Sequence, residues 1–201
     1  MLLLNACALF SKGEVPTRRY YTPTLTTSPS SAVVHSHAEL RLGRITAGAA
    51  IGERIMFRQS PQEVGFYEDR VWTEKPQAYL QRELTRVLFE ELGLRNVMRG
   101  AGPTLDVELL TFEEVLAPRH LGRVTVTFSL SDERVVSMQE TMSIERPIPP
   151  ASTPTAEGQA VAQAMGEALH DTVAQISQRV MDGLAATNSG SAPCPVADTK
   201  N

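Results

Sequence analysis

The chain has 201 residues, of which 42% are hydrophobic and 21% charged, and its 19 basic and 23 acidic residues give a net charge of −4. This length fits one domain with tails or two small domains, and enough residues are apolar to form a core, which argues against a fully disordered chain. The acidic balance argues against a nucleic-acid-binding protein, because such a protein needs a basic face for the phosphates. No apolar run approaches the roughly 18 residues of a transmembrane helix.

The N-terminal segment combines a lipidation motif with a polar tether. Leu4-Asn5-Ala6-Cys7 fits a bacterial lipobox, in which a small residue precedes the cysteine that takes a diacylglyceryl group. Only Leu2-Leu3-Leu4 stands in for the apolar signal, so we expect residues 1–6 to be a truncated signal peptide whose upstream start restores a longer, charged segment. Thr, Ser and Pro then predict a tether over 7–37, with a short strand near 19–22.

The first predicted elements of the folded domain are strands. Residues 38–46 alternate in polarity, and the phase slips at Gly43, which predicts a β-bulge. Residues 54–59 and 63–67 flank Ser60-Pro61-Gln62 and predict a β-hairpin.

A helix is predicted to follow the hairpin. Thr73 is placed to cap it, Pro76 falls in its first turn, and Gly93 is a stop signal. Its apolar stripe has helical spacing and comprises Tyr79, Leu80, Leu84, Val87, Leu88 and Leu92.

Three alternating strands come next. Apolar and polar residues alternate over 105–109, 124–130 and 136–144, with a tight turn predicted at 131–134. Clean alternation means that one face is buried and the other is wet, which is typical of an antiparallel sheet.

A long helix over 155–185 is predicted to close the domain, starting at Thr153 with Pro154 in the first helical position. We expect it to cover one sheet face with an apolar stripe of Val161, Met165, Leu169, Val173, Ile176, Val180 and Leu184. The folded domain is thus expected over 38–186 and a disordered tail over 187–201. The order of elements predicts an α+β fold, a mostly antiparallel sheet with two helices packed on one face.

The sequence displays no catalytic or metal-binding machinery. Cys7 and Cys194 lie near the two ends, so a closed zinc site has too few ligands and no disulfide framework is expected. Nucleophile-elbow, P-loop, dinucleotide-binding and zinc-protease motifs are absent from the sequence. We therefore expect no enzyme, no cofactor and no metal site.

Several polar or aromatic residues have a plain structural interpretation. Adjacent side chains diverge on a helix or strand, so Glu90-Glu91 and Glu113-Glu114 are expected on solvated faces rather than as carboxylate dyads. His35 and His37 fall in the tether and His120 in a loop, so these are expected to face solvent. His170 is expected on the flank of the long helix.

Trp72, the single tryptophan, lies just before the first predicted helix. It is interpreted either as a packing residue at the start of that helix or as an exposed anchor for a partner, because tryptophan is enriched at binding hot spots.

A set of motifs in a fixed order resembles the ABC-type transport auxiliary lipoproteins. The resemblance covers about residues 5–186 and includes the lipobox, Tyr20-Tyr21 and the Ala-rich last helix. The segments that carry it are Met56-Phe57-Arg58-Gln59-Ser60, Val64-Gly65-Phe66-Tyr67, Arg70-Val71-Trp72-Thr73-Glu74-Lys75-Pro76, and the later Leu105, Val107 and Phe112.

The resemblance implies a non-catalytic periplasmic lipoprotein anchored through Cys7. Its implied partners are ABC transporter subunits and an MCE-domain protein, which together move lipids between the inner and outer membranes; direct contact with phospholipid is left open. Trp72, Arg58 and the hairpin at Ser60-Pro61 are the hypothesised partner contacts. Ala8 is not the aspartate that retains lipoproteins at the inner membrane, so the periplasmic face of the outer membrane is the expected location.

Two other function classes stay open at this point. One is a general lipoprotein that supports an outer-membrane assembly, which gene neighbourhood would distinguish from lipid transport. The other is a periplasmic hydrolase, which a nucleophile–base pair in the structure would support.

Overall fold

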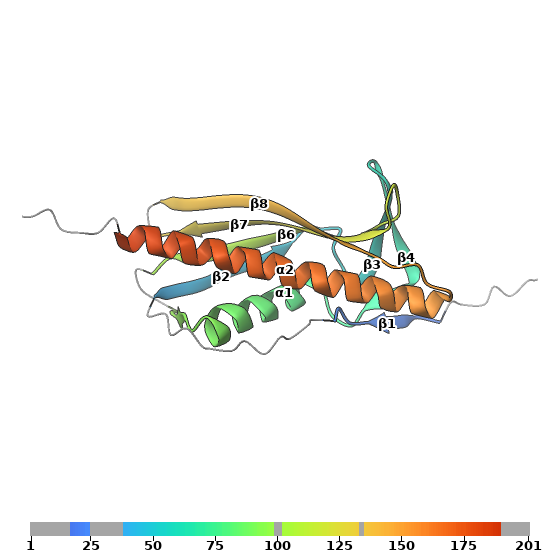
Figure 1. The fold of residues 1–201 in the computed structure, drawn as a ribbon, viewed down its shortest axis with the longest axis horizontal. Coiled ribbons are helices and arrows are strands. Elements are labelled where there is room, and N and C mark those ends of the chain that lie inside the picture. Colours follow the sequence, from blue (N-terminus) through green and yellow to red (C-terminus); the bar gives the residue numbers. More distant parts are fainter. Residues whose placement is uncertain (1–16, 25–37, 99–101, 133–134, 190–201) are drawn as a thin grey trace, which may run out of the picture.

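The computed structural model of the chain describes residues 17–24, 38–98, 102–132 and 135–189. Two helices lie on one face of a long twisted sheet, and the longer helix runs the length of the molecule (Figure 1). This arrangement confirms the predicted α+β fold. In chain order the elements are β1 (Arg19–Tyr21), β2 (Glu39–Ala47), β3 (Arg54–Ser60), β4 (Glu63–Trp72), α1 (Pro76–Thr85), the π-helical turn η1 (Arg86–Glu91), β5 (Arg95–Asn96), β6 (Thr104–Val115), β7 (Leu121–Ser131), β8 (Val136–Pro147) and α2 (Pro154–Ser189).

Strand β6 organises the sheet of eight described strands. One edge of β6 pairs with β7 along its whole length, and β7 pairs in turn with β8, both antiparallel. The other edge is shared: β2 pairs with the first half of β6 and β3 with its end, both parallel. Strand β4 forms an antiparallel hairpin with β3, and β1 is parallel to β4. The longest ladders are thus antiparallel, as alternation predicts, within a mixed sheet.

The N-terminal strands follow the sequence pattern closely. The pairing of β2 with β6 shifts register between Leu42 and Ile45, which confirms the irregularity predicted at Gly43. The hairpin of β3 and β4 turns between Ser60 and Glu63, as predicted.

The first helix begins later than predicted. Its N-cap is Lys75, so the prediction that Thr73 caps it is wrong. Thr73 instead shares side-chain hydrogen bonds with Thr22 and with the Tyr79 hydroxyl, at 2.8 and 2.7 Å. Pro76 opens the helix, and Gly93, with a φ of 65°, ends the helical segment in a conformation that side chains rarely adopt.

The long helix α2 confirms the predicted stripe. Thr153 accepts a hydrogen bond from the Ala156 N–H at the start of the helix. The helix ends at Ser189, three residues beyond the expected limit of the folded domain. Its apolar face packs mainly on β7 and β8, and its fully buried side chains include Val161, Met165, Leu169, Val173, Ile176 and Val180. None of the described helices is long and apolar enough to cross a membrane.

Candidate interaction site

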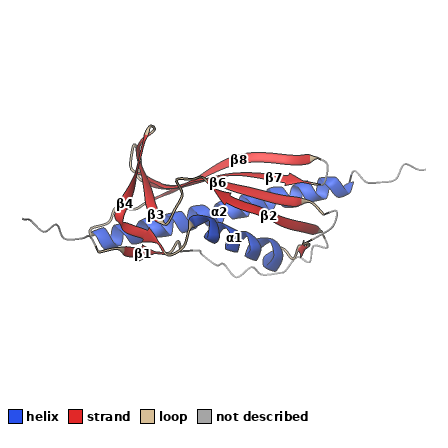
Figure 2. Cartoon of the chain, turned by 180° about the vertical axis from the view of Figure 1, so that it is seen from behind, coloured by secondary structure: helices blue, strands red, loops and turns tan. Residues whose placement is uncertain are grey.

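Within the described part of the chain, both helices lie on one face of the sheet, and we call the other face the open face. Seen from behind, the sheet lies in front of α2 and presents this face (Figure 2). Hydroxyl pairs run across its centre: Thr125 bonds to Ser143 at 3.0 Å and Thr127 to Thr141 at 2.7 Å. These are the polar positions of the alternating strands, so the open face is a surface of hydrogen-bonding groups.

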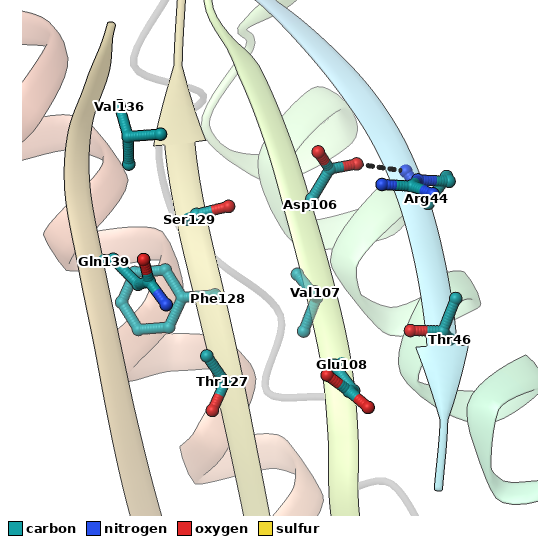
Figure 3. Close-up of a pocket in the computed structure, with 10 residues that line it drawn as sticks. All are labelled: Arg44, Thr46, Asp106, Val107, Glu108, Thr127, Phe128, Ser129, Val136 and Gln139. Carbon is teal, nitrogen blue, oxygen red and sulfur yellow. Dashed lines mark hydrogen bonds between the residues drawn. The ribbon is translucent and has the colours of Figure 1, made fainter. Parts of the chain in front are cut away.

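One hollow of about 390 Å³ lies between β2 and β8 on this face, and we call it the β2–β8 hollow. Arg44 and Asp106 line it, and the Arg44 backbone N–H donates to Asp106 Oδ1 at 2.6 Å (Figure 3). Thr127, Ser129 and further side chains from β6, β7 and β8 complete it. The lining therefore offers charges of both signs together with hydroxyl groups.

A second hollow of about 460 Å³, the Arg58 hollow, lies where two loops project from the sheet. The tip of the β3–β4 hairpin and the β6–β7 loop rise side by side there (Figure 1), and the Leu116 N–H donates to the Arg58 carbonyl at 2.9 Å. The hollow thus combines a rigid floor of sheet residues with a wall of two loops.

Ion pairs organise the Arg58 hollow. Arg58 Nε donates to Glu113 Oε1 at 2.9 Å, and its Nη1 donates to the Pro61 carbonyl at 2.9 Å. Arg123 lies 3.5 Å from the same Glu113 oxygen and also pairs with Glu145 at 2.9 Å. The hydrogen bond to Glu113 raises the pKa of Arg58, so this guanidinium stays charged. The hollow can engage a polar partner through arginine donors and carboxylate acceptors.

Glu113 and Glu114 are both buried, with side-chain exposures of 1% and 0%, so the prediction that they lie on solvated faces is wrong. They do point to opposite faces, as neighbours on a strand must. The reason for their burial is that β6 is an interior strand with neighbours on both edges. Glu113 lies under Arg58, whereas Glu114 Oε1 is 2.5 Å from His120 Nε2. His120 is consequently only about a third exposed and is held by a carboxylate.

On the helix side, a charged group fastens the start of α2 to the sheet. Arg70 Nη2 donates to Glu157 Oε2 at 2.7 Å, and its guanidinium lies over the Tyr67 ring at 4.2 Å from the ring centre. Burial, with a contribution from the nearby Glu114, raises the pKa of Tyr67, which therefore stays neutral. These groups pack between elements, so we assign them to the architecture rather than to a binding surface.

A further buried carboxylate, that of Glu83, joins the two helices. Burial alone would raise the pKa of Glu83, but hydrogen bonds from Arg86 and His170 outweigh it and lower that pKa. Arg86 Nη2 is 2.6 Å and His170 Nδ1 is 3.3 Å from Glu83 Oε1. His170 thus lies on the flank of α2, as predicted, with a structural partner.

The two residues proposed as partner contacts, Trp72 and Arg58, differ in their exposure to solvent. Trp72 is 2% exposed and packs edge-on against Phe112, with ring centres 5.3 Å apart. Trp72 therefore lies in the core, which agrees with its interpretation as a packing residue. It is too buried to act as a surface anchor. Arg58 lies at its hollow with 23% of its side chain exposed, and its role in partner binding stays a prediction. Cys7, His35, His37 and Cys194 lie outside the described residues.

The described residues hold no group of three or more His, Cys, Asp or Glu side chains placed to bind a metal ion. Both described imidazoles, those of His120 and His170, bond to carboxylates rather than to a hydroxyl or thiol. Each described imidazole is therefore held by a carboxylate of the fold.

Sequence reasoning missed most of the hollow residues. Arg44 lies on β2, whereas Asp106 and Glu113 lie on β6. The two hollows form around them because β6 pairs with β2 along its first half and with β3 at its end. A partial signal was present, because polar residues recur at every second position of β7 and β8. That pattern marks a wet face but does not show where the face is hollow.

Comparisons with known proteins agree with this architecture. The sequence model described as "ABC-type transport auxiliary lipoprotein component" matches residues 22–177. None of the curated proteins matches the sequence.

Similar folds occur among solved structures. Protein XCC0632 from Xanthomonas campestris is 22% identical, with a TM-score of 0.71 over 86% of this chain and 99% of that chain. The hypothetical protein CT253 from Chlamydia trachomatis is 12% identical, with a TM-score of 0.54 over 75% of this chain and 99% of that chain. At these identities the likeness shows a shared fold.

Proposed function

Since the chain belongs to the ABC-type transport auxiliary lipoprotein component family, we propose that it is the non-catalytic docking component of an MCE-type system that moves lipids between the inner and outer membranes. The observation that carries this proposal is the family match together with an open sheet face whose two hollows are lined by arginines, carboxylates and hydroxyls. ATP would be used by a separate transporter subunit.

We propose a non-catalytic role because each buried glutamate is paired with an arginine or a histidine of the fold. Glu113 is engaged by Arg58, Glu114 by His120, and Glu83 by Arg86 and His170. We therefore propose that these groups hold the fold together rather than act on a substrate. The shallow hollows of the open face suit a protein surface rather than an enclosed substrate.

The open face is the proposed docking surface for the MCE-domain partner. Its Thr and Ser side chains bond to one another across the strands, so the surface is already ordered before a partner arrives. Ordered polar groups lose less conformational entropy on binding than mobile ones do. Arg58 and the Ser60-Pro61 turn form the projecting rim of this face.

Membrane attachment is proposed to occur through Cys7, with residues 1–6 as signal-peptide residues and residues 7–37, which include β1, as the tether. A single acyl chain binds a bilayer only marginally, whereas two or more chains anchor stably. The periplasmic face of the outer membrane is the proposed destination.

The anchor is tested by expressing the chain behind a complete signal segment. The wild-type protein should fractionate with membranes, and the Cys7→Ala variant should be released or left unprocessed. An unmodified Cys7 in membrane-extracted protein, measured by intact mass, would refute the anchor.

The partnership is tested by affinity purification of the anchored protein from a strain that expresses the neighbouring transporter genes. We expect the MCE-domain protein to co-purify with it. Failure to recover that protein, together with robust hydrolysis of an ester or glycan by the purified chain, would reverse the assignment.

A further inference from the structure

We propose that a hollow between β1 and the start of α2 binds the phosphate group of an anionic membrane phospholipid. This hollow, the β1–α2 hollow, has a volume of about 380 Å³. Its lining residues are Arg19, Tyr20, Tyr21, Thr22, Thr24, Thr155, Gln159 and Ala162. The proposal rests on the proposed function for the position of the lipid anchor.

The charge of the β1–α2 hollow distinguishes it from others on the described surface. Its lining contains one arginine and no carboxylate. Four other hollows each contain at least one acidic residue, namely Asp106 and Glu108, Glu113 and Glu145, Glu53, or Glu90. In a chain with a net charge of −4, a hollow lined by arginine, hydroxyls and an amide favours an anion.

A buried hydroxyl of this hollow lacks a partner. Tyr21 is 8% exposed, and its hydroxyl has no hydrogen-bond partner among the described residues. The ring reaches this position because α2 carries Gly158 there: a Cβ at that position would lie 2.3 Å from the Tyr21 hydroxyl. An unpaired buried donor is costly, and an oxygen of a phosphate group would accept its proton.

The start of α2 adds a favourable field. The hollow is lined by Thr155 and Gln159 from the first turns of the helix, where the positive end of the helix dipole favours anions. The Thr24 N–H donates to the Ala162 carbonyl at 3.3 Å, which holds the segment after β1 against the helix. Helix, strand and segment thus form one wall around the hollow.

The position along the chain points to a membrane. Only residues 8–18 separate Cys7 from Arg19, a connection that spans at most about 40 Å. The 36 residues of α2 extend on the order of 50 Å, so an anchored Cys7 keeps the β1 end nearer the bilayer than the far end of α2.

The surface beside the hollow fits a bilayer interface. Tyr20 is 64% exposed, and Arg18 and Arg19 are exposed next to it. Tyrosine is enriched at membrane interfaces, and exposed basic residues attract anionic lipid headgroups.

The test uses the full-length Cys7→Ala protein, whose membrane binding does not depend on acylation. We expect it to co-sediment with phosphatidylglycerol vesicles and much less with phosphatidylcholine vesicles. Arg19→Gln should weaken binding to phosphatidylglycerol about fivefold. Arg95→Gln is the matched control, because Arg95 is 65% exposed on β5, outside the proposed site, and it should bind as the parent does.

The Tyr21→Phe variant separates a ligand role from a structural one. Removing an unpaired buried hydroxyl should raise the melting temperature of the free protein by about 2–4 °C. The same variant should lose affinity for phosphatidylglycerol vesicles. Equal binding by Tyr21→Phe and its parent would overturn the proposal, and so would equal binding to the two kinds of vesicle.

A third binding measurement uses soluble sn-glycerol 3-phosphate, because this free phosphoester carries the same phosphate group as a phospholipid headgroup. Tight binding of this compound without vesicle binding would overturn the lipid assignment. Loss of the MCE-domain partner with vesicle binding intact would contradict the proposed function alone, whereas a co-purifying partner without vesicle selectivity would contradict this inference alone.

Discussion

The two faces of the sheet are built from the same strands but contact different surroundings. On the covered face, α2 buries Val161, Leu169 and Val173 completely against β7 and β8. On the open face, alternate residues of those strands form hydroxyl pairs such as Thr127 with Thr141. The strands therefore divide their side chains between holding the fold and presenting a polar surface.

This division separates the residues that stabilise the fold from the residues that are available to a partner. Burial of apolar area supplies most of the stability on the covered face. Exposed polar contacts contribute little to folding, so the open face is free to be shaped by a partner. The following substitutions test the division from the largest expected effect to the smallest.

Leu169→Ala attacks the covered face where its side chain is fully buried. The lost apolar contacts and the resulting cavity should lower the free energy of unfolding by about 2–5 kcal/mol. Urea denaturation followed by circular dichroism measures this change. A loss below about 0.5 kcal/mol would contradict the packing of α2 on the sheet.

Arg58→Ala removes the arginine that pairs with the buried carboxylate of Glu113 on the open face. It leaves Glu113, 1% exposed, with Arg123 as its remaining basic neighbour at 3.5 Å. We expect a loss of about 1–3 kcal/mol. Adding Glu113→Gln to this variant should restore part of the stability, because it removes the buried charge that has lost its nearest partner. No recovery in urea denaturation would show that the ion pair is not the cause.

Glu83 should make a smaller contribution to the free energy of unfolding, and this contribution should be lost in acid. Its folded-state pKa is lowered from the ordinary value of 4.5, so its stabilisation is complete above that value and is lost as the pH falls through the lowered pKa. Glu83→Gln should therefore be less stable than wild type near neutral pH, and the difference should shrink in acid. Melting temperatures between pH 3 and pH 7 (roughly the carboxyl titration range) measure this, and a constant difference would argue against the ionic role.

Thr127→Ala should produce the smallest effect. It removes one hydroxyl pair from the open face, where surface changes usually stay within about 0.5 kcal/mol. Urea denaturation in parallel with Leu169→Ala gives the comparison. A loss as large as that of Leu169→Ala would mean that the open face also holds the fold together.

The residues of the covered face could be predicted from the sequence, because the spacing of apolar residues shows directly which side of a helix or strand is buried. The stripe on α2 and the alternation of β7 and β8 each identify one buried side. The parallel pairing of β2 and β3 with β6 was not visible in those patterns, because alternation does not name a strand's neighbour. Thr73 was misjudged as a cap because its hydroxyl bonds to Tyr79 instead, a contact that depends on how the helix packs.

The candidate site was harder to predict for the same reason. Polarity at Glu113 and Glu114 indicated solvent, yet the interior position of β6 buries both. Trp72 carried the chemistry of a binding anchor but packs on Phe112. Arg58 was identified through the family resemblance, whereas its neighbours in the hollow follow only from the topology.

Co-purification of the MCE-domain protein with a Thr127→Arg variant tests the docking role of the open face most directly. The new side chain would place a bulky charge in the β2–β8 hollow, which Thr127 lines, so we expect the partner to be lost while the melting temperature is retained. Ala174→Arg, on the exposed side of α2, is the matched control and should keep the partner. Retention of the MCE-domain protein by Thr127→Arg at the level of that control would contradict the account.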